Sequence, residues 1–230
     1  KAVGTAALLG LWIALPATLG YLLARPAEAL AALDRAVAQR PQDADALGSR
    51  AVVLLALGAL AASGCFDSGT VVGFGGSAAG IAAVGILDDR FSVRASIRLL
   101  VHIAAACWFL IWCWAAVPHP DVAQAPILLA GWTVLLVTGL VGAVNVVNFM
   151  DGIDGLGASQ AVFMAAAGAW LLGTDGDGAC TQELLGVLAA ASAGFLVWNI
   201  SPLRIFLGDV GSGFLGFALA ASFLLASGES

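Results

Sequence analysis

The sequence predicts an all-α fold, a polytopic bundle of about eight transmembrane helices, and three observations lead to this prediction. Of the 230 residues, 61% are hydrophobic and only 10% are charged, and the mean hydropathy of +0.99 is far above that of soluble domains. Apolar runs close to the roughly 20 residues needed to cross a bilayer recur along the chain. These runs are rich in Ala, Leu, Val and Gly without sustained polar–apolar alternation, which favours helices over an outer-membrane β-barrel.

The limits of the apolar runs give the expected spans in chain order. They lie near residues 3–23, 51–66, 70–87, 97–117, 127–147, 160–173, 184–200 and 210–226. The second and the sixth are short for a span, because each contains fewer apolar residues in a row than its neighbours. Small residues between positions 73 and 80 would let neighbouring helices approach closely.

The polar segment between the first two spans is expected to be an amphipathic cytoplasmic connector, residues 24–50. The stretch from Pro26 to Gly58 also looks like the second helix of one tetratricopeptide repeat followed by the first helix of the next. One partial unit cannot bury its own apolar face, since such repeats need about three units to be stable. We therefore treat residues 1–230 as one membrane domain, with the polar motifs in a core at 70–225.

The four cysteines have neither CxxC spacing nor a paired framework, and most lie in or beside predicted spans. We expect them to behave as buried small apolar residues. They are Cys65, Cys107, Cys113 and Cys180. The first span has no small-residue cleavage site, so no signal peptide is predicted.

Basic residues indicate how the bundle is oriented. Apart from Lys1, they fall in the first loop, at 90–98 and at 204, three places that an eight-span topology puts on one face. The opposite loops, at 67–69, 118–126 and 174–183, contain no Lys or Arg. The positive-inside rule makes the arginine-bearing face cytoplasmic. The net charge of −6 and the absence of a basic stripe with aromatic residues argue against a nucleic-acid partner.

The first of three polar clusters on that face is the stretch GILDDRFSVR, in which adjacent Asp88 and Asp89 close the third span. Two neighbouring carboxylates raise one another's pKa unless a cation or hydrogen-bond donors offset the repulsion. A hard divalent metal or a polarised phosphate group would supply that compensation. The competing interpretation is a solvated helix end with Arg90 as the counter-ion.

The second cluster, NVVNFMDGIDGLG, ends the fifth span. Asn145, Asn148, Asp151 and Asp154 recur every three residues, which on a helix would form a polar stripe. The glycines that follow Asp151 weaken the helix and leave backbone N–H groups accessible to a ligand. The alternative is a plain glycine turn with capping aspartates, which explains the glycines but not the two asparagines within an apolar run.

The third cluster places Asp209 at the start of the last span, where a carboxylate that caps the helix is an ordinary structural explanation. The three clusters together are more informative, because five aspartates gather at one membrane surface, where ionisable residues are functional candidates. They are Asp88, Asp89, Asp151, Asp154 and Asp209. Oxygen ligands without a Cys or His cluster suit Mg²⁺ better than zinc, and such a site suggests phosphate chemistry.

The stretches GILDDR, NVVNFMDGIDGLGAS and WNISPLRIFLGDVGSGFLG resemble, in order and spacing, the central motifs of the polyprenyl-phosphate N-acetylhexosamine-1-phosphate transferases. The segment DVGSGFLGF is most similar to the O-antigen-initiating branch of this family. The resemblance implies transfer of a sugar 1-phosphate from a UDP-N-acetylhexosamine to undecaprenyl phosphate, with release of UMP, to initiate lipid-linked cell-wall or O-antigen glycan synthesis. It further implies Mg²⁺ as cofactor, with Mn²⁺ as a substitute, a multi-pass chain in the bilayer of the bacterial inner membrane, and homodimers as one assembly.

Residue roles also follow from the resemblance. Asp88 and Asp89 correspond to the paired aspartates that bind or deprotonate the lipid phosphate, and Asp209 to the Mg²⁺ ligand, with Asp151 as a second metal ligand. Residues implied to bind the substrate nucleotide are Asn148, Asp151, Gly152, Ile153, Asp154, Asn199 and Phe206. Because the second pKa of a phosphate monoester is about 6, a carboxylate base is optional and both roles remain open for Asp88.

Two parts of the family pattern have no match in this sequence. A basic cytoplasmic motif is expected where residues 24–50 stand, so the basic residue that would hold the pyrophosphate is not assigned. A late histidine-rich loop is also absent, and we expect His102 to be a core histidine and His119 a solvated one. A catalytically inactive or truncated relative acting as a scaffold is therefore one alternative. A cation-coupled transporter is another, although it would more naturally place carboxylates at mid-span.

Overall fold

The protein is described by a computed structural model that covers Val53 and residues 64–119, 126–175, 178–200 and 205–229. The predicted span at 3–23, the connector at 24–50 and most of the predicted span at 51–66 lie outside the described residues. Within the described ranges the regular elements are helices.

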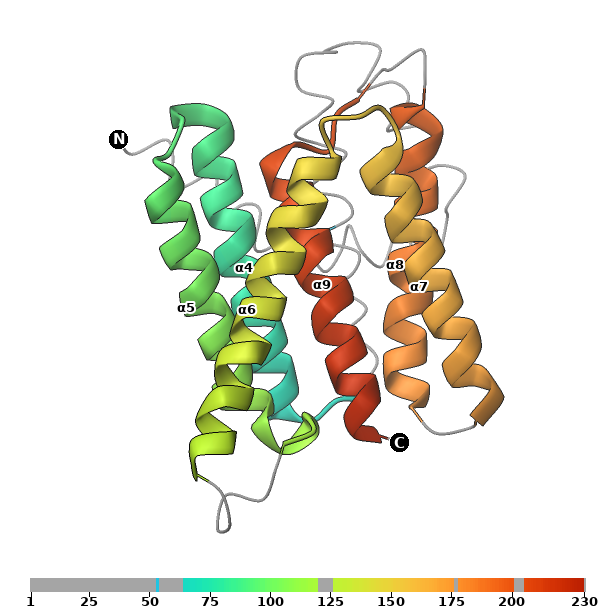
Figure 1. The fold of residues 1–230 in the computed structure, drawn as a ribbon. Coiled ribbons are helices and arrows are strands. Elements are labelled where there is room, and N and C mark those ends of the chain that lie inside the picture. The colour runs from blue at the N-terminus through green and yellow to red at the C-terminus, as the bar shows by residue number, and fades with distance from the viewer. Residues whose placement is uncertain (1–52, 54–63, 120–125, 176–177, 201–204, 230) are drawn as a thin grey trace. The chain divides into compact units, whose positions relative to one another are not determined.

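The described helices match the last six predicted spans one for one. They are α4 (Ser68–Phe91), α5 (Ala95–Cys113), α6 (Pro126–Met150), α7 (Leu156–Asp175), α8 (Ala179–Asn199) and α9 (Gly208–Glu229), with a short 3-10 turn η1 (Trp114–Ala116) after α5 (Figure 1). Each contains a segment long and apolar enough to cross a membrane. The all-helical bundle is thus confirmed for six of the eight predicted spans. The predicted span at 160–173 is longer than expected, because α7 begins with small and polar residues that hydropathy alone leaves out.

Helix α9 is the most enclosed of the six. Of its apolar window, 72% is buried inside the protein, against 17% for α6, and it packs against α4, α6, α7 and α8 (Figure 1). Phe217 on α9 lies against Phe74 of α4 and Phe109 of α5, with ring centroids 5.5 and 5.7 Å apart. Aromatic packing of this kind fixes the helix that carries Asp209 relative to its neighbours.

Two glycines allow the helices to approach closely near the site. A Cβ atom at Gly85 of α4 would lie only 2.7 Å from the backbone of Val210 at the start of α9. A Cβ atom at Gly216 of α9 would lie 2.6 Å from the carbonyl oxygen of Ala143 on α6. Small residues at these crossings let backbones touch, as in other membrane helix pairs. They bring the C-terminal half of α4 and of α6 against the N-terminal half of α9.

The cysteines differ from the expectation of four unpaired apolar residues. Cys65, just before α4, and Cys180, at the start of α8, form a disulfide across a sequence separation of 115 residues. The prediction missed the bond because no local spacing reveals such a pairing. Cys113 is buried as expected, whereas Cys107 is exposed on a face of α5. The disulfide lies at the opposite end of the bundle from Asp209, since α4 and α8 both begin there and run toward the aspartates.

Candidate functional site

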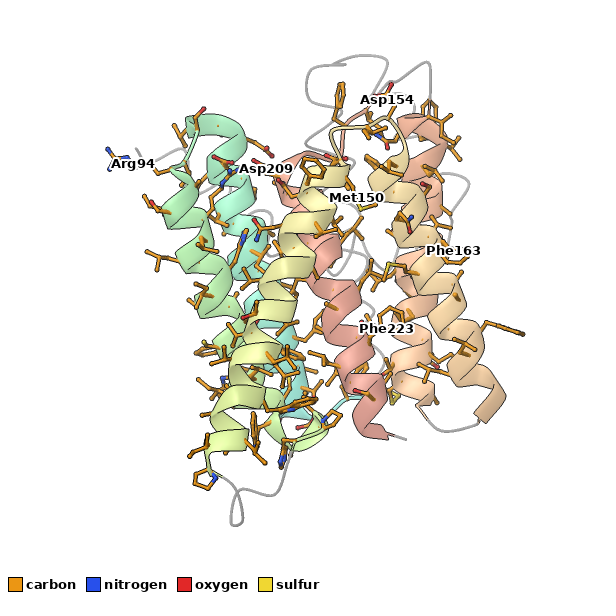
Figure 2. The ribbon with its side chains drawn as sticks, viewed as in Figure 1. Arg94, Met150, Asp154, Phe163, Asp209 and Phe223 are labelled. Carbon is orange, nitrogen blue, oxygen red and sulfur yellow. A yellow bond between two sulfur atoms is a disulfide. The ribbon has the colours of Figure 1, made fainter. Side chains whose placement is uncertain are left out.

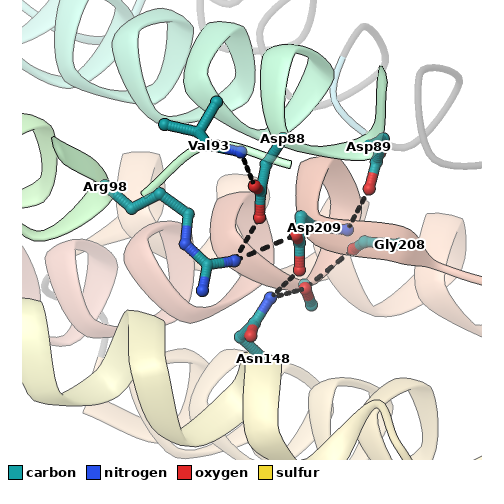
Figure 3. A network of polar contacts seen from close by, with 8 residues as sticks. Asp88, Asp89, Val93, Arg98, Asn148, Gly208 and Asp209 are labelled. Atoms are coloured by element: carbon teal, nitrogen blue, oxygen red, sulfur yellow. Dashed lines mark hydrogen bonds and ion pairs between the residues drawn. The ribbon is translucent and has the colours of Figure 1, made fainter. Parts of the chain in front are cut away.

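The site is built around Arg98, which binds two carboxylates from different motifs. Its Nη1 atom donates to Asp88 Oδ2 at the end of α4 and to Asp209 Oδ2 at the start of α9, the latter at 3.2 Å (Figure 3). The Asp88 side chain is 8% exposed, that of Arg98 33% and that of Asp209 29%. Sequence reasoning used Arg98 only to orient the bundle and missed it as a site residue. The signal that could have found it is its position at the start of a span, ten residues after Asp88.

The end of α4 orients Asp88. The helix terminates at Ser92, which adopts a left-handed conformation and donates its N–H to the Asp88 carbonyl oxygen. The next N–H, of Val93, donates to Asp88 Oδ1 at 2.6 Å (Figure 3). With Arg98 on the other oxygen, both carboxylate oxygens of Asp88 have a donor. This is not the solvated helix end with Arg90 as counter-ion that the sequence left open.

The neighbouring Asp89 points to a different partner. Its Oδ1 atom accepts the backbone N–H of Asp209 at 3.1 Å, so it occupies the N-terminus of α9, where the helix dipole favours an anion (Figure 3). Gly208 precedes that contact with φ +65°, and a Cβ atom there would lie 3.2 Å from Asp89 Oδ2. Glycine at 208 is thus required by its backbone conformation and by the adjacent carboxylate. The paired aspartates play two separate structural roles.

Asn148, near the end of α6, completes the contacts of Asp209. Its Nδ2 atom donates to Asp209 Oδ1 at 2.5 Å and to Ser212 Oγ at 2.9 Å, and the Ser212 hydroxyl donates to the Gly208 carbonyl oxygen at 2.7 Å. Ser212, one turn into α9, was not predicted as a site residue. Helices α4, α5 and α6 therefore all contact Asp209 at the start of α9, through Asp89, Arg98 and Asn148. Figure 2 shows Asp209 at the same end of the bundle as Met150 and Asp154.

The predicted helical stripe from Asn145 to Asp154 is wrong beyond Met150. Helix α6 ends there, and residues 151–155 form a turn. Gly155, at φ +73°, adopts a conformation that an α-helix does not contain. The glycine turn that the sequence left open as an alternative is therefore the one that forms, whereas the two asparagines remain on the helix. Asn145 lies one turn before Asn148, and its Nδ2 donates to the Val141 carbonyl oxygen at 2.7 Å.

Asp151 in this turn has a strongly perturbed pKa. Burial raises the pKa of its carboxyl most, the Gly208 N–H lowers this pKa, and the negative charges of Asp209 and Asp89 raise it. The net result is a rise of the pKa from 3.8 to about 6. The shift of this pKa therefore reflects burial first and the neighbouring carboxylates second. Among the described residues, four aspartates share the site with Arg98, so the electrostatics there favour an additional cation.

The remaining predicted residues form the rim. Ile153 is 61% exposed and Phe206 is 53% exposed, and Gly152 and Asp154 are exposed as well. Asn199 is instead buried at the end of α8. Its Oδ1 accepts the Gly155 N–H at 3.1 Å and its Nδ2 donates to the Ile205 carbonyl oxygen at 2.9 Å.

Asn199 thus ties the 151–155 turn to the segment that leads into α9. Because both ends of its amide contact backbone, its position explains how the rim is held, and its predicted contact with uracil stays a prediction.

The donor set fits Mg²⁺ only in company with a phosphate ligand. Within the described ranges, no three Asp, Glu, His or Cys side chains lie close enough together to hold a metal by themselves. Mg²⁺ in phosphoryl-transfer sites is commonly bound by one or two carboxylates together with substrate phosphates and water. Asp209 and Asp151 could supply those carboxylates, since Asp151 lies close enough to Asp209 for the Asp209 charge to raise the pKa of the Asp151 carboxyl.

Comparison with known proteins agrees with this architecture. The profile of glycosyl transferase family 4 matches residues 71–227. The chain is 29% identical, over 188 residues, to a Bacillus subtilis protein described as a probable undecaprenyl-phosphate N-acetylglucosaminyl 1-phosphate transferase, covering 78% of this chain and 50% of the relative. It is 31% identical over 163 residues to the phospho-N-acetylmuramoyl-pentapeptide-transferase of Synechococcus elongatus, covering 64% of this chain and 44% of the relative.

A third relative is the decaprenyl-phosphate N-acetylglucosaminephosphotransferase of Mycobacterium tuberculosis, 31% identical over 159 residues, with 64% of this chain and 39% of the relative covered. The chain spans half or less of the length of these relatives. The family match includes nearly all of α4 and most of α9, and therefore Asp88, Asp89 and Asp209. The chain is therefore a multi-pass membrane protein that belongs to glycosyl transferase family 4.

Proposed function

We propose that the protein transfers an N-acetylhexosamine 1-phosphate from a UDP-sugar to undecaprenyl phosphate and releases UMP. The observation that carries this proposal is the polar network at one end of a membrane bundle, in which Arg98 joins Asp88 to Asp209 and Asn148 donates to Asp209. A lipid phosphate and a soluble nucleotide can both reach such an end. The activities described for the relatives support the same class of reaction. Initiation of lipid-linked cell-wall or O-antigen glycan synthesis would be its biological role.

The reaction needs positioning more than bond-making by the protein. An anionic oxygen of the lipid phosphate attacks the sugar-linked phosphorus, a new phosphorus–oxygen bond forms, and the bond to UMP breaks, with the electron pair leaving on UMP. Arg98 carries the positive charge closest to this centre in the described residues, and its guanidinium can bind phosphate oxygens. Mg²⁺, held by Asp209 and Asp151, would neutralise charge on the phosphates when bound.

The contacts of Asp88 favour one of its two open roles. Its oxygens already accept hydrogen bonds from Val93 N–H and Arg98, so the carboxylate is held rather than poised to receive a proton. We infer that Asp88 orients Arg98 against the lipid phosphate. A base is not required, since at neutral pH, above its second pKa of about 6, the lipid phosphate is largely deprotonated.

The exposed rim fits the nucleotide. Phe206 and Ile153 are large apolar side chains with more than half of their surface accessible, on two segments that Asn199 ties together. A uracil ring could stack on such an aromatic face. We expect Phe206→Ala to raise the KM for the UDP-sugar more than that for the lipid, and equal effects on both constants would contradict the stacking role.

Two observations support an active site on the cytoplasmic side. The described arginines, Arg90, Arg94 and Arg98, all lie at the site end of the bundle, as the positive-inside rule requires of a cytoplasmic face. The Cys65–Cys180 disulfide lies at the other end, and disulfides persist in oxidising compartments outside the cytosol. Labelling intact bacteria with a membrane-impermeant thiol reagent, after placing a single cysteine at residue 154 or residue 67, tests this orientation. Only the cysteine at 67 should react.

The activity test uses the full chain in nanodiscs with undecaprenyl phosphate, Mg²⁺ or Mn²⁺, and a panel of UDP-N-acetylhexosamines, following UMP release. We expect UMP that depends on lipid and metal from one donor. Asp209→Asn should abolish it while the protein stays folded, and retained activity would remove Asp209 as a metal ligand.

A matched control is Asp67→Asn. Asp67 caps α4 at the opposite end, accepting the N–H groups of Gly69 and Thr70, so its substitution should leave transfer intact. Folded wild-type protein that releases no UMP from any donor would favour the alternative of an inactive relative acting as a scaffold. A transporter is disfavoured, because Asp88 and Asp209 lie in the last and first turns of their helices rather than at mid-span.

A further inference from the structure

A small cavity lies directly beneath the carboxylate cluster. Its volume is about 30 Å³, and Arg98, Asn148 and Asp209 line its upper part. Each of their helices also contributes a residue three or four positions deeper in the bundle, which on an α-helix is about one turn, or roughly 5 Å. These deeper residues are His102, Asn145 and Gly213. The cavity thus extends from the site toward the membrane interior.

His102 has an unsatisfied nitrogen in this region. Its Nδ1 atom is buried and has no hydrogen-bond partner among the described residues. A buried polar atom without a partner destabilises a protein, and such atoms are usually satisfied by ordered water when the space is polar and large enough. A cavity needs roughly 10 to 15 Å³ to hold one water molecule, so this one can hold one or two.

We propose that water in this cavity links His102 Nδ1 to Asp209, which makes His102 a positioning residue of the transferase site. This inference rests on the proposed function. A water molecule can donate one hydrogen to Nδ1 and the other to the Asp209 carboxylate. Asp209 already accepts from Arg98 on one oxygen and Asn148 on the other, and a third donor from below would fix the orientation in which its oxygens meet a ligand.

The polar wall of the cavity supports water over a dry space. Asn145 and Arg98 also line it, together with Asn148 and Asp209, so most of the side chains that could contact a water molecule there carry polar groups. The competing explanation is that His102 only fills space between helices, as a core histidine would. The two explanations differ in what an apolar residue of similar size does at this position.

The kinetic test compares His102→Leu with His102→Gln, because glutamine can hydrogen-bond to the water and leucine cannot. We expect His102→Leu to lower kcat, and to raise the Mg²⁺ concentration for half-maximal rate, by about tenfold, as loss of a partner of a metal ligand commonly does. His102→Gln should recover most of the loss. Equal rates in wild type and His102→Leu, or equal losses in both variants, would overturn the proposal.

Ser192→Ala is the matched control. Its hydroxyl, on α8 and outside this cavity, is also buried without a partner among the described residues, so the variant removes an equivalent polar atom away from the site. Its kinetics should equal those of wild type.

A second measurement does not depend on activity. The chain has two histidines, so ¹⁵N-histidine labelling in a His119→Gln background leaves the imidazole signals of His102 alone. We expect Asp209→Asn to shift these signals, Asp67→Asn to leave them unchanged, and magnetisation transfer from water to reach the ring. Signals that ignore both Asp209 and water would overturn the link. Wild-type protein without transferase activity, but with these responses, would refute the proposed function and leave the link between His102 and Asp209 standing.

Discussion

Replacing Asp151 by asparagine should stabilise the protein at neutral pH while reducing transfer. The carboxyl of Asp151 is forced to ionise in a partly buried position beside Asp209 and Asp89, which raises its pKa from 3.8 to about 6. A shift of about 2 units at about 1.4 kcal/mol per unit corresponds to about 3 kcal/mol. Because the carboxylate is partly exposed, solvent screening makes this an upper limit. Asparagine keeps a similar shape and removes the charge.

The stabilisation should depend on pH in a defined direction. Between about pH 4 and pH 6 the folded wild type binds a proton at Asp151 that the unfolded chain has lost. Its stability therefore falls as pH rises through this window. Asp151→Asn has no carboxyl at this position and so does not lose stability in this pH range. The two proteins should therefore be equally stable near pH 4. The variant should be more stable by the full amount above pH 7.

Thermal unfolding in detergent, followed by the fluorescence of the seven tryptophans, measures this difference without added divalent metal. For a chain of this size, 2 to 3 kcal/mol corresponds to a rise of about 5 to 10 °C in Tm. Asp154→Asn is the control, because Asp154 is exposed in the same turn and its substitution should change little at any pH. A gap between wild type and Asp151→Asn that is the same at pH 4 and pH 8, or a less stable variant at pH 8, would refute the reasoning.

Three further predictions concern the contacts that assemble the site. Arg98→Gln removes the cation shared by two carboxylates and should lower the free energy of unfolding at pH 8 by about 2 kcal/mol, as measured by thermal unfolding. The variant should also raise the KM for the lipid, and an unchanged KM would argue against phosphate binding by Arg98. Gly85→Ala would place a Cβ atom 2.7 Å from the α9 backbone, so it should lower the free energy of unfolding by about 2 kcal/mol and remove most activity. At Gly80 a Cβ atom would have nothing within 4 Å, so Gly80→Ala should be neutral in the same assays. Replacing Cys65 and Cys180 by serine should lower the Tm of the oxidised protein to that of the reduced wild type; a Tm insensitive to reductant would show that the bond contributes no stability.

Much of the bundle could be predicted because hydropathy and helix length are local properties. Each described span was located within a few residues by its apolar run. The polar clusters at Asp88, Asp151 and Asp209 stood out for the same reason, as carboxylates where apolar runs end. Prediction failed where a local pattern allowed two outcomes, as at residues 151–155, where glycine conformation prevailed over the three-residue spacing.

The sequence by itself determined that this chain is a helical membrane protein with the aspartates of its three polar clusters at one end, because the period and length of apolar runs set both. Only the tertiary structure decided which side chains meet. Arg98 and Asp209 are 111 residues apart, and Cys65 and Cys180 are 115 apart, so no local pattern connects them. Arg98 lies on α5 and Cys180 on α8, so these contacts depend on how the helices of the bundle pack against one another. Glycines at the helix crossings help to set that packing.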